Sequence, residues 1–560
     1  MIGKEQLVTV NLNDSIISVM RSMNDAGSSL AIIIDKDERL VGIVTDGDIR
    51  RGFIDGHSKN KSIETIMNSS PTVVKHNMNT ETMNRLINDS FKCIPVLDDN
   101  DRVQGILNYQ DKSIMLDVKS RNVCVLGMGY VGLTLSLMLA ESGFTVYGFD
   151  VNKSLIDKIN SGEASFHEDG IDAYLQRHCN KNLIATTELN TIQADTYIVT
   201  VGTPIDLETH LPRIEYIKQA IGTIAPILKR NDLLILRSTV PVGTTRNVVL
   251  PILDEMSNLV AGKDYYLAYA PERTVEGKAL QEIKELPQVI GGYNEKSRVM
   301  TELLFRELTS TIIDVGTLES AEMIKIMNNT YRDVKFAYAN EMALICKDLG
   351  LDMVKLVHAA NMGYVRDKIP VPSPGVGGAC LSKDSYILMY SSKDIKYSPE
   401  IVERSRKLNE KIPLDIAQEV KRTLSIIDKL GKPIKVFIIG FAFKGKPETS
   451  DMRGSTTLDI LEYLKKENVI SDTVFGYDPI VSQTDIEDIG VKFVSLETGF
   501  ESADVVLILN NHGSYINMDI FSLLESAQSD CIFVDGWHLF EPEDITRIND
   551  IKYIGVGCKY

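Results

Sequence analysis

Cys380 is the residue of this 560-residue chain whose type and setting point most directly to chemistry. It stands in a glycine-rich stretch, residues 377–384, far downstream of a Gly-x-Gly-x-x-Gly loop at residues 127–132. A dinucleotide alone can oxidise an alcohol to an aldehyde. A cysteine that adds to the aldehyde forms a thiohemiacetal, which can give up a second hydride and become a thioester. The pairing therefore suggests redox chemistry through a covalent thiol intermediate.

The glycine loop stands in the order of elements that a dinucleotide site requires. Residues 122–126 are a buried-strand run, a helix is expected over 133–141, and a strand over 145–149 ends in Asp150. This order places a pyrophosphate at a helix N-terminus and a ribose at a strand end. An acid at that strand end repels a 2'-phosphate, so NAD is favoured over NADP. The expected cofactor contacts are Gly127, Gly129, Tyr130, Val131, Gly132 and Asp150.

Two further expected strands, 196–201 and 233–236, run into polar elbows that contain Thr203 and Thr239. The carboxyl ends of strands line the ligand crevice of a doubly wound sheet. Both threonines are therefore candidates for contacts near the nicotinamide, although such turn residues are also common without a ligand.

The bulk composition indicates a globular protein of three or four domains, since 44% of the residues are apolar and 24% are charged. A formal net charge of −17 argues against a nucleic-acid or anionic-membrane partner. The seven cysteines lack metal-ligand or disulfide-framework spacing, so reduced thiols and no metal site are expected. No leader-like start and no run of membrane-spanning length is seen, and a cytoplasmic protein is expected.

The N-terminal segment is duplicated. A shift of 63 positions superposes Asp35 on Asp98 and Gly42 on Gly105. Each copy is expected to contain a strand, a helix and two strands around an Asp-rich turn, with the helices at about 15–26 and 80–89. Neither copy is large enough to stand alone.

This duplicated segment resembles a pair of CBS (cystathionine β-synthase type) repeats over about residues 1–118. The resemblance implies that Thr45 and Asp48 hold the ribose of an adenine nucleotide, with Asn108 and Asp111 at the matching positions of the second copy. A purely packing or assembly role is equally open, because an Asp at a strand-to-helix junction is often a helix N-cap.

Two downstream segments add the remaining polar groups. Glu272 and Glu276 follow a strand at about 266–270, and Lys325 and Asn329 lie four apart on one face of a long expected helix. Together with residues 377–384 and 440–455, these segments resemble the nucleotide-sugar 6-dehydrogenase family, which includes UDP-glucose and GDP-mannose dehydrogenases. The resemblance runs from about Arg121 to the C-terminus.

The resemblance implies a role for each matching residue. Cys380 is the nucleophile and Asp384 its partner, Lys325 and Asn329 stabilise oxyanions, and Glu272 handles the hydrolytic water. Further contacts are implied for Glu276 and Arg453 at the cofactor and for Arg366, Gly377 and Lys444 at the substrate.

Two neighbours of Cys380 are open to more than one interpretation. Lys383 could lower the pKa of the thiol, or it could be an ordinary partner of Asp384. Ser382 departs from the family, many of whose members have proline there.

The Pro-Glu-Arg string at 271–273, with residues 331–341 and 510–512, resembles the N-acetylhexosamine branch of the family. The implied reaction is four-electron, NAD-dependent oxidation at C6 of a UDP-N-acetylhexosamine, with UDP-N-acetylmannosamine favoured. UDP-N-acetylglucosamine and UDP-glucose are alternative substrates. A two-electron dehydrogenase with a structural Cys380, and a nucleotide-sensing protein with an inactive dehydrogenase body, are the rival functions.

The expected fold class is α/β, with two Rossmann-like doubly wound domains joined by a long central helix and preceded by the α/β CBS pair. The expected domains are the CBS pair, the NAD domain, a central helical and dimerisation region that carries the cysteine loop, and a UDP-sugar domain, with bounds 1–118, 119–312, 313–420 and 421–560. A homodimer or higher homo-oligomer is expected.

Overall fold

A computed structural model describes residues 2–3, 7–26, 28, 30–75, 93–108, 118–470, 473–548 and 550–559. The chain forms two compact units, Met1–Ser120 and Arg121–Tyr560. Within the described residues, no helix combines the length and the apolar character that a membrane crossing needs.

The strands of the first unit repeat along the chain. The antiparallel pair β3 (Leu30–Ile34) and β4 (Leu40–Thr45) recurs as β6 (Cys93–Leu97) and β7 (Val103–Asn108), each strand 63 positions later. Both pairs lose register one residue before the end of their first strand. The predicted duplication is therefore confirmed.

The Asp-rich turns of the two copies are equally alike. The carboxylate of Asp35 accepts hydrogen bonds from the backbone amides two and four residues later, and that of Asp98 does the same. The first predicted helix is confirmed as α1 (Ile16–Asp25), which packs its buried face on the sheet. The second predicted helix, 80–89, lies outside the described residues.

The second unit begins with an eight-stranded sheet in the order β10-β9-β8-β11-β12-β13-β14-β15, parallel except between β13 and β14. The first six positions of this order are those of a dinucleotide-binding doubly wound sheet. Its central strands are mostly apolar and buried because helices cover both faces. The strands are β8 (Asn122–Leu126), β9 (Thr145–Phe149), β10 (Leu183–Thr186), β11 (Thr196–Val199), β12 (Leu233–Leu236), β13 (Tyr266–Tyr269), β14 (Gln288–Gly292) and β15 (Ile312–Asp314).

Two predicted bounds in this sheet are wrong by a few residues. The helix expected from Leu133 begins inside the glycine loop, as α4 (Tyr130–Glu141). The strand expected to reach residue 201 ends at Val199, because the hydroxyl of Thr200 turns to the carbonyls of Leu126 and Gly127, at 2.9 and 2.7 Å.

The C-terminal part of the second unit repeats this architecture in a seven-stranded sheet of order β18-β17-β16-β19-β20-β21-β22, parallel except between β21 and β22. Its helix α15 (Thr456–Lys466) follows the first strand at the same place as α4 in the other sheet. The strands are β16 (Val436–Ile439), β17 (Val474–Tyr477), β18 (Val491–Phe493), β19 (Val505–Ile508), β20 (Ile532–Asp535), β21 (Lys552–Gly555) and β22 (Cys558–Lys559).

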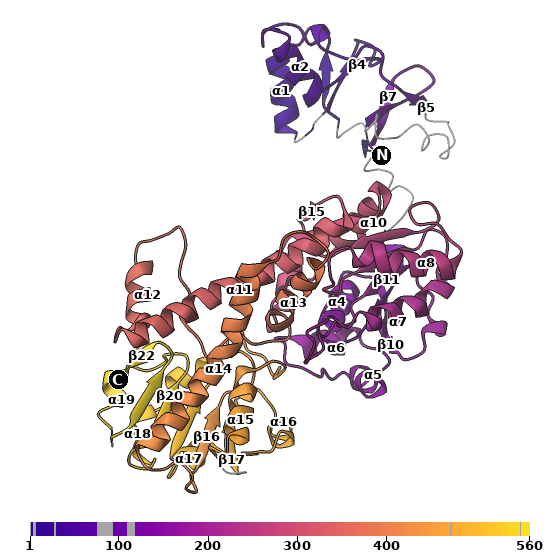
Figure 1. Cartoon of the computed structure of the whole chain (residues 1–560). Helices are drawn as coiled ribbons and strands as arrows, with labels where there is room; N and C mark the ends of the chain where they lie inside the picture. Colours follow the sequence, from indigo (N-terminus) through magenta and orange to yellow (C-terminus); the bar gives the residue numbers. More distant parts are fainter. Residues whose placement is uncertain are drawn as a thin grey trace. The chain divides into compact units, whose positions relative to one another are not determined.

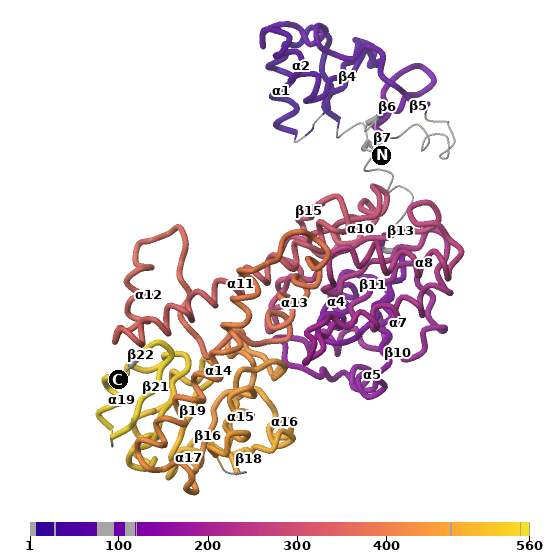
Figure 2. Tube along the Cα trace, viewed as in Figure 1, coloured from indigo at the N-terminus to yellow at the C-terminus, as the bar shows by residue number. Residues whose placement is uncertain are grey.

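A long helix, α11 (Leu318–Asp348), connects the two sheets, as predicted (Figure 1). The helix α14 (Glu400–Ile426) packs along it, and the shorter α13 (Leu381–Ser391) lies against both (Figure 2). Lys325 and Asn329 both lie on the buried face of α11. The tertiary structure thus brings the start of α13, just after Cys380, beside the polar groups of the central helix.

Candidate functional site

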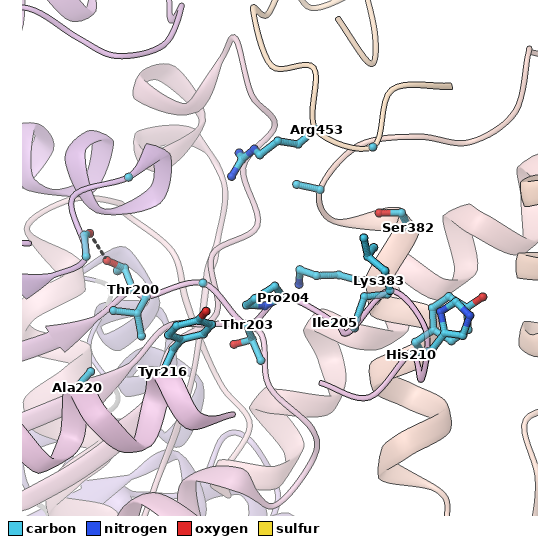
Figure 3. A pocket seen from close by; sticks show the side chains of 18 of the residues that line it. Thr200, Thr203, Pro204, Ile205, His210, Tyr216, Ala220, Ser382, Lys383 and Arg453 are labelled. Carbon is cyan, nitrogen blue, oxygen red and sulfur yellow. Dashed lines mark hydrogen bonds between the residues drawn. The ribbon is translucent and has the colours of Figure 1, made fainter. Parts of the chain in front are cut away.

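A cavity of about 1160 Å³ lies where the eight-stranded sheet of the second unit faces α13, α14 and the start of α15. The carboxyl ends of β8, β9 and β11 form one wall, and Ser382 and Lys383 of α13 face them from the other side (Figure 3). Five of the predicted cofactor contacts line this space, namely Gly127, Gly129, Asp150, Thr203 and Arg453.

The glycine loop fits a ligand approached by its backbone. Gly127 has φ 95°, in the left-handed region. A Cβ on Gly132 would lie 1.8 Å from the carbonyl oxygen of Gly127, so α4 can start against the loop only with glycine there. A Cβ on Gly129 would meet nothing within 4 Å. The loop therefore opens into free space at the N-terminus of α4, where a pyrophosphate can be held.

Asp150 is fixed at the end of β9 by two backbone amides. Its carboxylate accepts hydrogen bonds from Met128 N at 2.8 Å and from Asn152 N at 2.9 Å. The carboxylate is thereby held between the glycine loop and the cavity, as a ribose-binding acid must be. Thr203 also faces the cavity, and its buried hydroxyl has no hydrogen-bond partner among the described residues.

Tyr130 ties the glycine loop to the segment that carries Glu276. Its hydroxyl donates to the buried carboxylate of Glu168, and Gly277 N donates to both groups, at 3.1 Å and 2.8 Å. Sequence reasoning missed Glu168, since it stands in a stretch without a motif. Val131, which follows Tyr130 and is also predicted to contact the cofactor, is half-buried in the first turn of α4.

Cys380 immediately precedes α13 and is exposed. Its neighbours Ala379 and Ser382 line the cavity. Although Cys380 is exposed to solvent as a residue, the protein around its sulfur disfavours the thiolate and raises the pKa of the thiol, and the charges of Lys325 and Lys383 only partly oppose this shift. Lys383 thus lowers the pKa of the thiol and also pairs with Asp384, so both interpretations of this lysine hold, but burial has the larger effect on the pKa.

Four of the predicted catalytic side chains form two buried pairs beside this cysteine. Lys325 Nζ lies 3.4 Å from Glu272 Oε2, and Asn329 Nδ2 donates to Asp384 Oδ2 over 2.5 Å. Lys383 Nζ contacts the other oxygen of the same aspartate at 2.8 Å. The cluster thus brings a cation, an amide donor and two carboxylates together beside Cys380.

The charge state of this cluster follows from its surroundings. Burial disfavours ionised Glu272, but the charges of Lys325 and Arg237 outweigh that effect and hold the pKa of Glu272 below its ordinary value. Burial likewise disfavours charged Lys325, and the carboxylates and thiol around it raise its pKa nevertheless. The site therefore contains an ionised carboxylate and an ammonium group, shielded from water.

Arg237 is a second residue that sequence reasoning did not select. It is buried, and its Nη1 donates to the carbonyl of Ala270 at 3.0 Å and to Gln288 Oε1 at 2.9 Å. Ala270 directly follows β13 and precedes Glu272 by two residues. Burial lowers its pKa to about 10, which leaves it charged at neutral pH. Its position directly after the buried strand β12 was the available signal.

Glu276, Lys444 and Arg453 come together although 168 positions separate the first two. Lys444 Nζ donates to the carbonyl of Glu276 at 2.7 Å, and Arg453 Nη2 lies 3.9 Å from its carboxylate. Burial and the nearby charge of Asp451 raise the pKa of Glu276 to about 7. The loop after β16 thus closes on the NAD-side segment.

Gly377 is the point where the cysteine loop meets α15. A Cβ there would lie 2.3 Å from the carbonyl oxygen of Gly454. Two other predicted residues do not join the cavity walls. Thr239 is half-buried, and Arg366 is exposed in the loop after α12 (Met353–Asn361).

In the first unit, Thr45 and Asp48 contact each other. Thr45 is the N-cap of α2 (Asp46–Ile54), and Asp48 completes a capping box with it, accepting from the Thr45 amide at 2.9 Å and from its hydroxyl at 2.7 Å. The alternative that Asp48 itself is the N-cap is wrong, since it is the third residue of the helix. Asn108 ends β7, and Asp111 lies outside the described residues.

Family models match most of the chain. The NAD binding, central and UDP binding domains of the UDP-glucose/GDP-mannose dehydrogenase family match residues 121–309, 319–411 and 437–542, and CBS domains match 2–55 and 63–111. NAD is accordingly the cofactor of the cavity at β8, β9 and β11.

Individual relatives agree with these matches. The chain is 32% identical over 437 residues to the UDP-N-acetyl-D-mannosamine dehydrogenase of Pyrococcus horikoshii, covering 78% of this chain and 99% of that protein. A solved structure of UDP-D-ManNAc dehydrogenase from P. horikoshii superposes with a TM-score of 0.70 at 31% identity, over 78% of this chain and 99% of that one. The UDP-N-acetyl-mannosamine dehydrogenase of Staphylococcus aureus gives a TM-score of 0.66 at 28% identity, over 78% and 98%.

The chain therefore belongs to the UDP-glucose/GDP-mannose dehydrogenase family, as an NAD-dependent nucleotide-sugar dehydrogenase that carries CBS domains at its N-terminus.

Proposed function

We propose that this enzyme oxidises the C6 hydroxyl of a UDP-N-acetylhexosamine, with UDP-N-acetylmannosamine favoured, to the uronic acid through a covalent bond to Cys380. The observation that carries the proposal is the placement of an exposed thiol beside the NAD cavity and next to the Lys325–Glu272 and Asn329–Asp384 pairs. The names of the relatives favour the N-acetylmannosamine sugar.

The proposed chemistry balances over two oxidations. NAD bound at the glycine loop would supply the hydride acceptor for each of the two oxidations at C6, and the hydroxyl proton of each step would go to a neighbouring base. After the first oxidation, Cys380 adds to the aldehyde carbon and its proton goes to the new hydroxyl or to a neighbouring base. The second oxidation of this thiohemiacetal leaves a thioester, and water then breaks the C–S bond to release the acid and restore the thiol.

The neighbouring residues have complementary tasks in this scheme. Lys325 and Asn329 supply a cation and an amide N–H where negative charge develops on the C6 oxygen. Glu272 is held ionised, so it can accept a proton from the attacking water. Asp384 orients Asn329 through the 2.5 Å hydrogen bond. Because the pKa of the thiol is raised, addition needs a base to take its proton.

The test is a panel of UDP-sugars with NADH as the readout. Two NADH per sugar and a uronate product are expected, with the highest kcat/KM for UDP-N-acetylmannosamine. One NADH per sugar would mean that oxidation stops at a carbonyl and that Cys380 is structural. Sugar and NAD binding without turnover would favour a nucleotide-sensing protein with an inactive dehydrogenase body.

For the first unit, the proposal is that an adenine nucleotide binds at the turn of Thr45 and Asp48 and changes the enzyme rate. The capping box already uses one oxygen of Asp48, and its other oxygen contacts Arg51 on the exposed side of α2. A ribose would have to compete with that surface ion pair, which costs little. Rates of the full chain and of a chain that starts at residue 118 should respond differently to AMP and ATP. Identical responses would exclude this role.

For assembly, the proposal is a homodimer through α11. Four large apolar side chains of α11 and that of its C-cap residue follow one face with spacings of four and seven, and each is 45% exposed or more: Met327, Tyr331, Tyr338, Ile345 and Leu349. A stripe of that extent on a helix is typical of a protein interface. A second copy of the chain supplies a matching stripe. Light scattering should show a dimer, and Tyr331→Glu with Tyr338→Glu should give a monomer.

A further inference from the structure

The loop that carries Cys380 is held by a buried ion pair that the chemistry above does not use. Asp333 on α11 and Arg406 on α14 are 0% and 2% exposed, and Arg406 Nη1 lies 3.0 Å from Asp333 Oδ1. Buried charges of this kind occur only when they are paired and hydrogen-bonded.

The guanidinium also contacts the cysteine loop on both sides of Cys380. Arg406 Nη2 donates to the carbonyl of Val376 at 3.1 Å, and Nη1 donates to the carbonyl of Leu381 at 3.2 Å. The first carbonyl precedes Cys380 by four residues, and the second follows it directly. The Arg406 guanidinium, which is planar and has fixed donor directions, therefore constrains the backbone conformation on both sides of Cys380.

Asp333 makes a corresponding set of contacts. Ser385 Oγ donates to its Oδ2 at 2.9 Å, and Asn409 Nδ2 donates to its Oδ1 at 2.7 Å. Ser385 directly follows Asp384, the hydrogen-bond partner of Asn329. Asp333 in turn stands four residues after Asn329 on the same buried face of α11. One carboxylate thus links the helix of Lys325 and Asn329 to the helix that starts at the cysteine.

The network continues to the start of the loop. Asn409 Oδ1 accepts from Asn340 Nδ2 at 3.2 Å, and Asn340 Oδ1 accepts from the backbone amide of Ser373 at 3.0 Å. The loop is consequently anchored at residues 373, 376 and 381 by side chains from two helices.

We propose that Arg406 and Asp333 are positioning residues for Cys380, which hold the thiol at the distance from Lys325 and from the cavity that attack on C6 requires. This inference rests on the proposed role of Cys380 as the nucleophile. Neither residue is assigned a contact with the reacting atoms, although Arg406 also borders the cavity. Each acts through the backbone around the cysteine, where a displacement of about 1 Å can cost about 100-fold in rate.

The test compares Arg406→Lys with a matched control, Arg121→Lys, in the full-length protein. Lysine keeps the charge but cannot donate to two carbonyls and a carboxylate together. Arg121 is also buried, at 4% exposed, and its guanidinium donates to two carbonyls, those of Asp195 and Asn231, far from the cysteine loop. Both variants remove the same kind of buried group.

Two readouts are taken. The first is the pH profile of iodoacetamide alkylation of Cys380, measured on its own peptide by mass spectrometry, which needs no substrate. The second is turnover, with the NAD dissociation constant measured alongside. Arg406→Lys is expected to shift the alkylation profile and to lower kcat by about 10- to 100-fold with KM and NAD affinity little changed. Arg121→Lys is expected to leave all of these near wild type.

An alkylation profile and kcat at wild-type values in Arg406→Lys would overturn the proposal, as would equal changes in Arg121→Lys. If Arg406→Lys does not fold, Ser385→Ala serves in its place. It keeps the ion pair and removes one hydrogen bond to Asp333, so a small shift of the alkylation profile away from that of wild type is expected, and no shift would overturn the proposal. A wild-type enzyme that turns over no UDP-sugar would instead overturn the proposed function, while the alkylation comparison would still decide the positioning role.

Discussion

Lys325 Nζ lies 3.4 Å from Glu272 Oε2, and only 8% and 13% of the two side chains are exposed. An ammonium and a carboxylate shielded in this way stabilise each other chiefly because neither has water as an alternative partner. The pair also lies beside Cys380, whose ionisation the lysine favours. The stability of the fold and the proposed reactivity of Cys380 therefore both depend on the contact between Lys325 and Glu272.

Removing both members of this pair should cost less than the sum of the two single losses. Lys325→Met is expected to lower the free energy of unfolding by about 3 kcal/mol, because Glu272 is left buried without its nearest cation. The double variant Lys325→Met with Glu272→Gln should recover about 1 to 3 kcal/mol relative to the sum of the single losses. Urea unfolding of the four proteins gives the coupling energy.

The control is Lys347→Met on the same helix, whose partner Glu419 lies 3.3 Å away with both side chains about a quarter exposed or less. Its loss should be about 1 kcal/mol or less. If the double variant at Lys325 and Glu272 loses as much free energy of unfolding as the two single variants together, the pairing is contradicted.

Replacing Cys380 should abolish uronate formation without loss of NAD binding. Cys380→Ser is expected to lower the rate at least about 1000-fold, since no thioester can form. Cys179→Ser, a half-buried cysteine whose thiol donates to the Ile159 carbonyl, is the control. Uronate at an undiminished rate from Cys380→Ser would end the covalent mechanism.

The thiol of Cys380 should react only at alkaline pH. Burial raises its pKa, so the alkylation rate at pH 7.5 is expected to be below that of free cysteine and to keep rising past the ordinary thiol pKa of about 8.5. Lys325→Met removes a charge that favours the thiolate, and it should slow the reaction further. A plateau below pH 8 in the wild type would show a thiolate at neutral pH and contradict this.

Glu276 makes the folded protein sensitive to pH near neutrality. Its pKa in the folded state is raised to about 7 by burial and by Asp451. The folded state therefore binds this proton more tightly than the unfolded state, so its contribution to stability is complete below the ordinary carboxyl pKa and is lost as pH rises through about 7.

Glu276→Gln should consequently be more stable than wild type at pH 8, by about 2 kcal/mol, and nearly equal to it at pH 4.5. Thermal unfolding across this range measures the difference. Glu285→Gln, at an exposed position of α9 (Ala279–Glu285), serves as the control. A difference that does not change with pH would disprove the raised pKa.

Asp150 should decide the choice between NAD and NADP. Its carboxylate is held by the amides of Met128 and Asn152, at a place where we expect it to meet a ribose diol and to repel a 2'-phosphate. Asp150→Asn is expected to lower kcat/KM for NAD about 10-fold and to raise it for NADP. An unchanged ratio of kcat/KM for NAD to kcat/KM for NADP would mean that another residue discriminates between the two at the 2'-position of the ribose.

Local patterns predicted much of this molecule. The glycine loop, the strand that ends in Asp150, the duplicated N-terminal strands and the long helix with Lys325 and Asn329 on one face are short-range features, and each follows from periodicity, glycine spacing or an alignment of the chain with itself. The residue type of Cys380 and its glycine-rich neighbourhood were equally visible.

Other properties depend on which groups lie close together across hundreds of residues. Arg237, Glu168 and the Asp333–Arg406 pair carry no motif, because a buried polar residue is recognisable only when its partners are in place. The convergence of Lys444 and Arg453 on Glu276, and the exposed position of Arg366, are likewise results of tertiary folding.

The net pKa of Cys380 is the clearest example of this division. The sequence by itself determined the cysteine, the two lysines and the aspartate, and the family resemblance predicted that they lie near a dinucleotide site. Only the tertiary structure decided that desolvation outweighs the lysine charges and raises the pKa of the thiol, because desolvation depends on the protein packed around the sulfur and not on its neighbours in the chain.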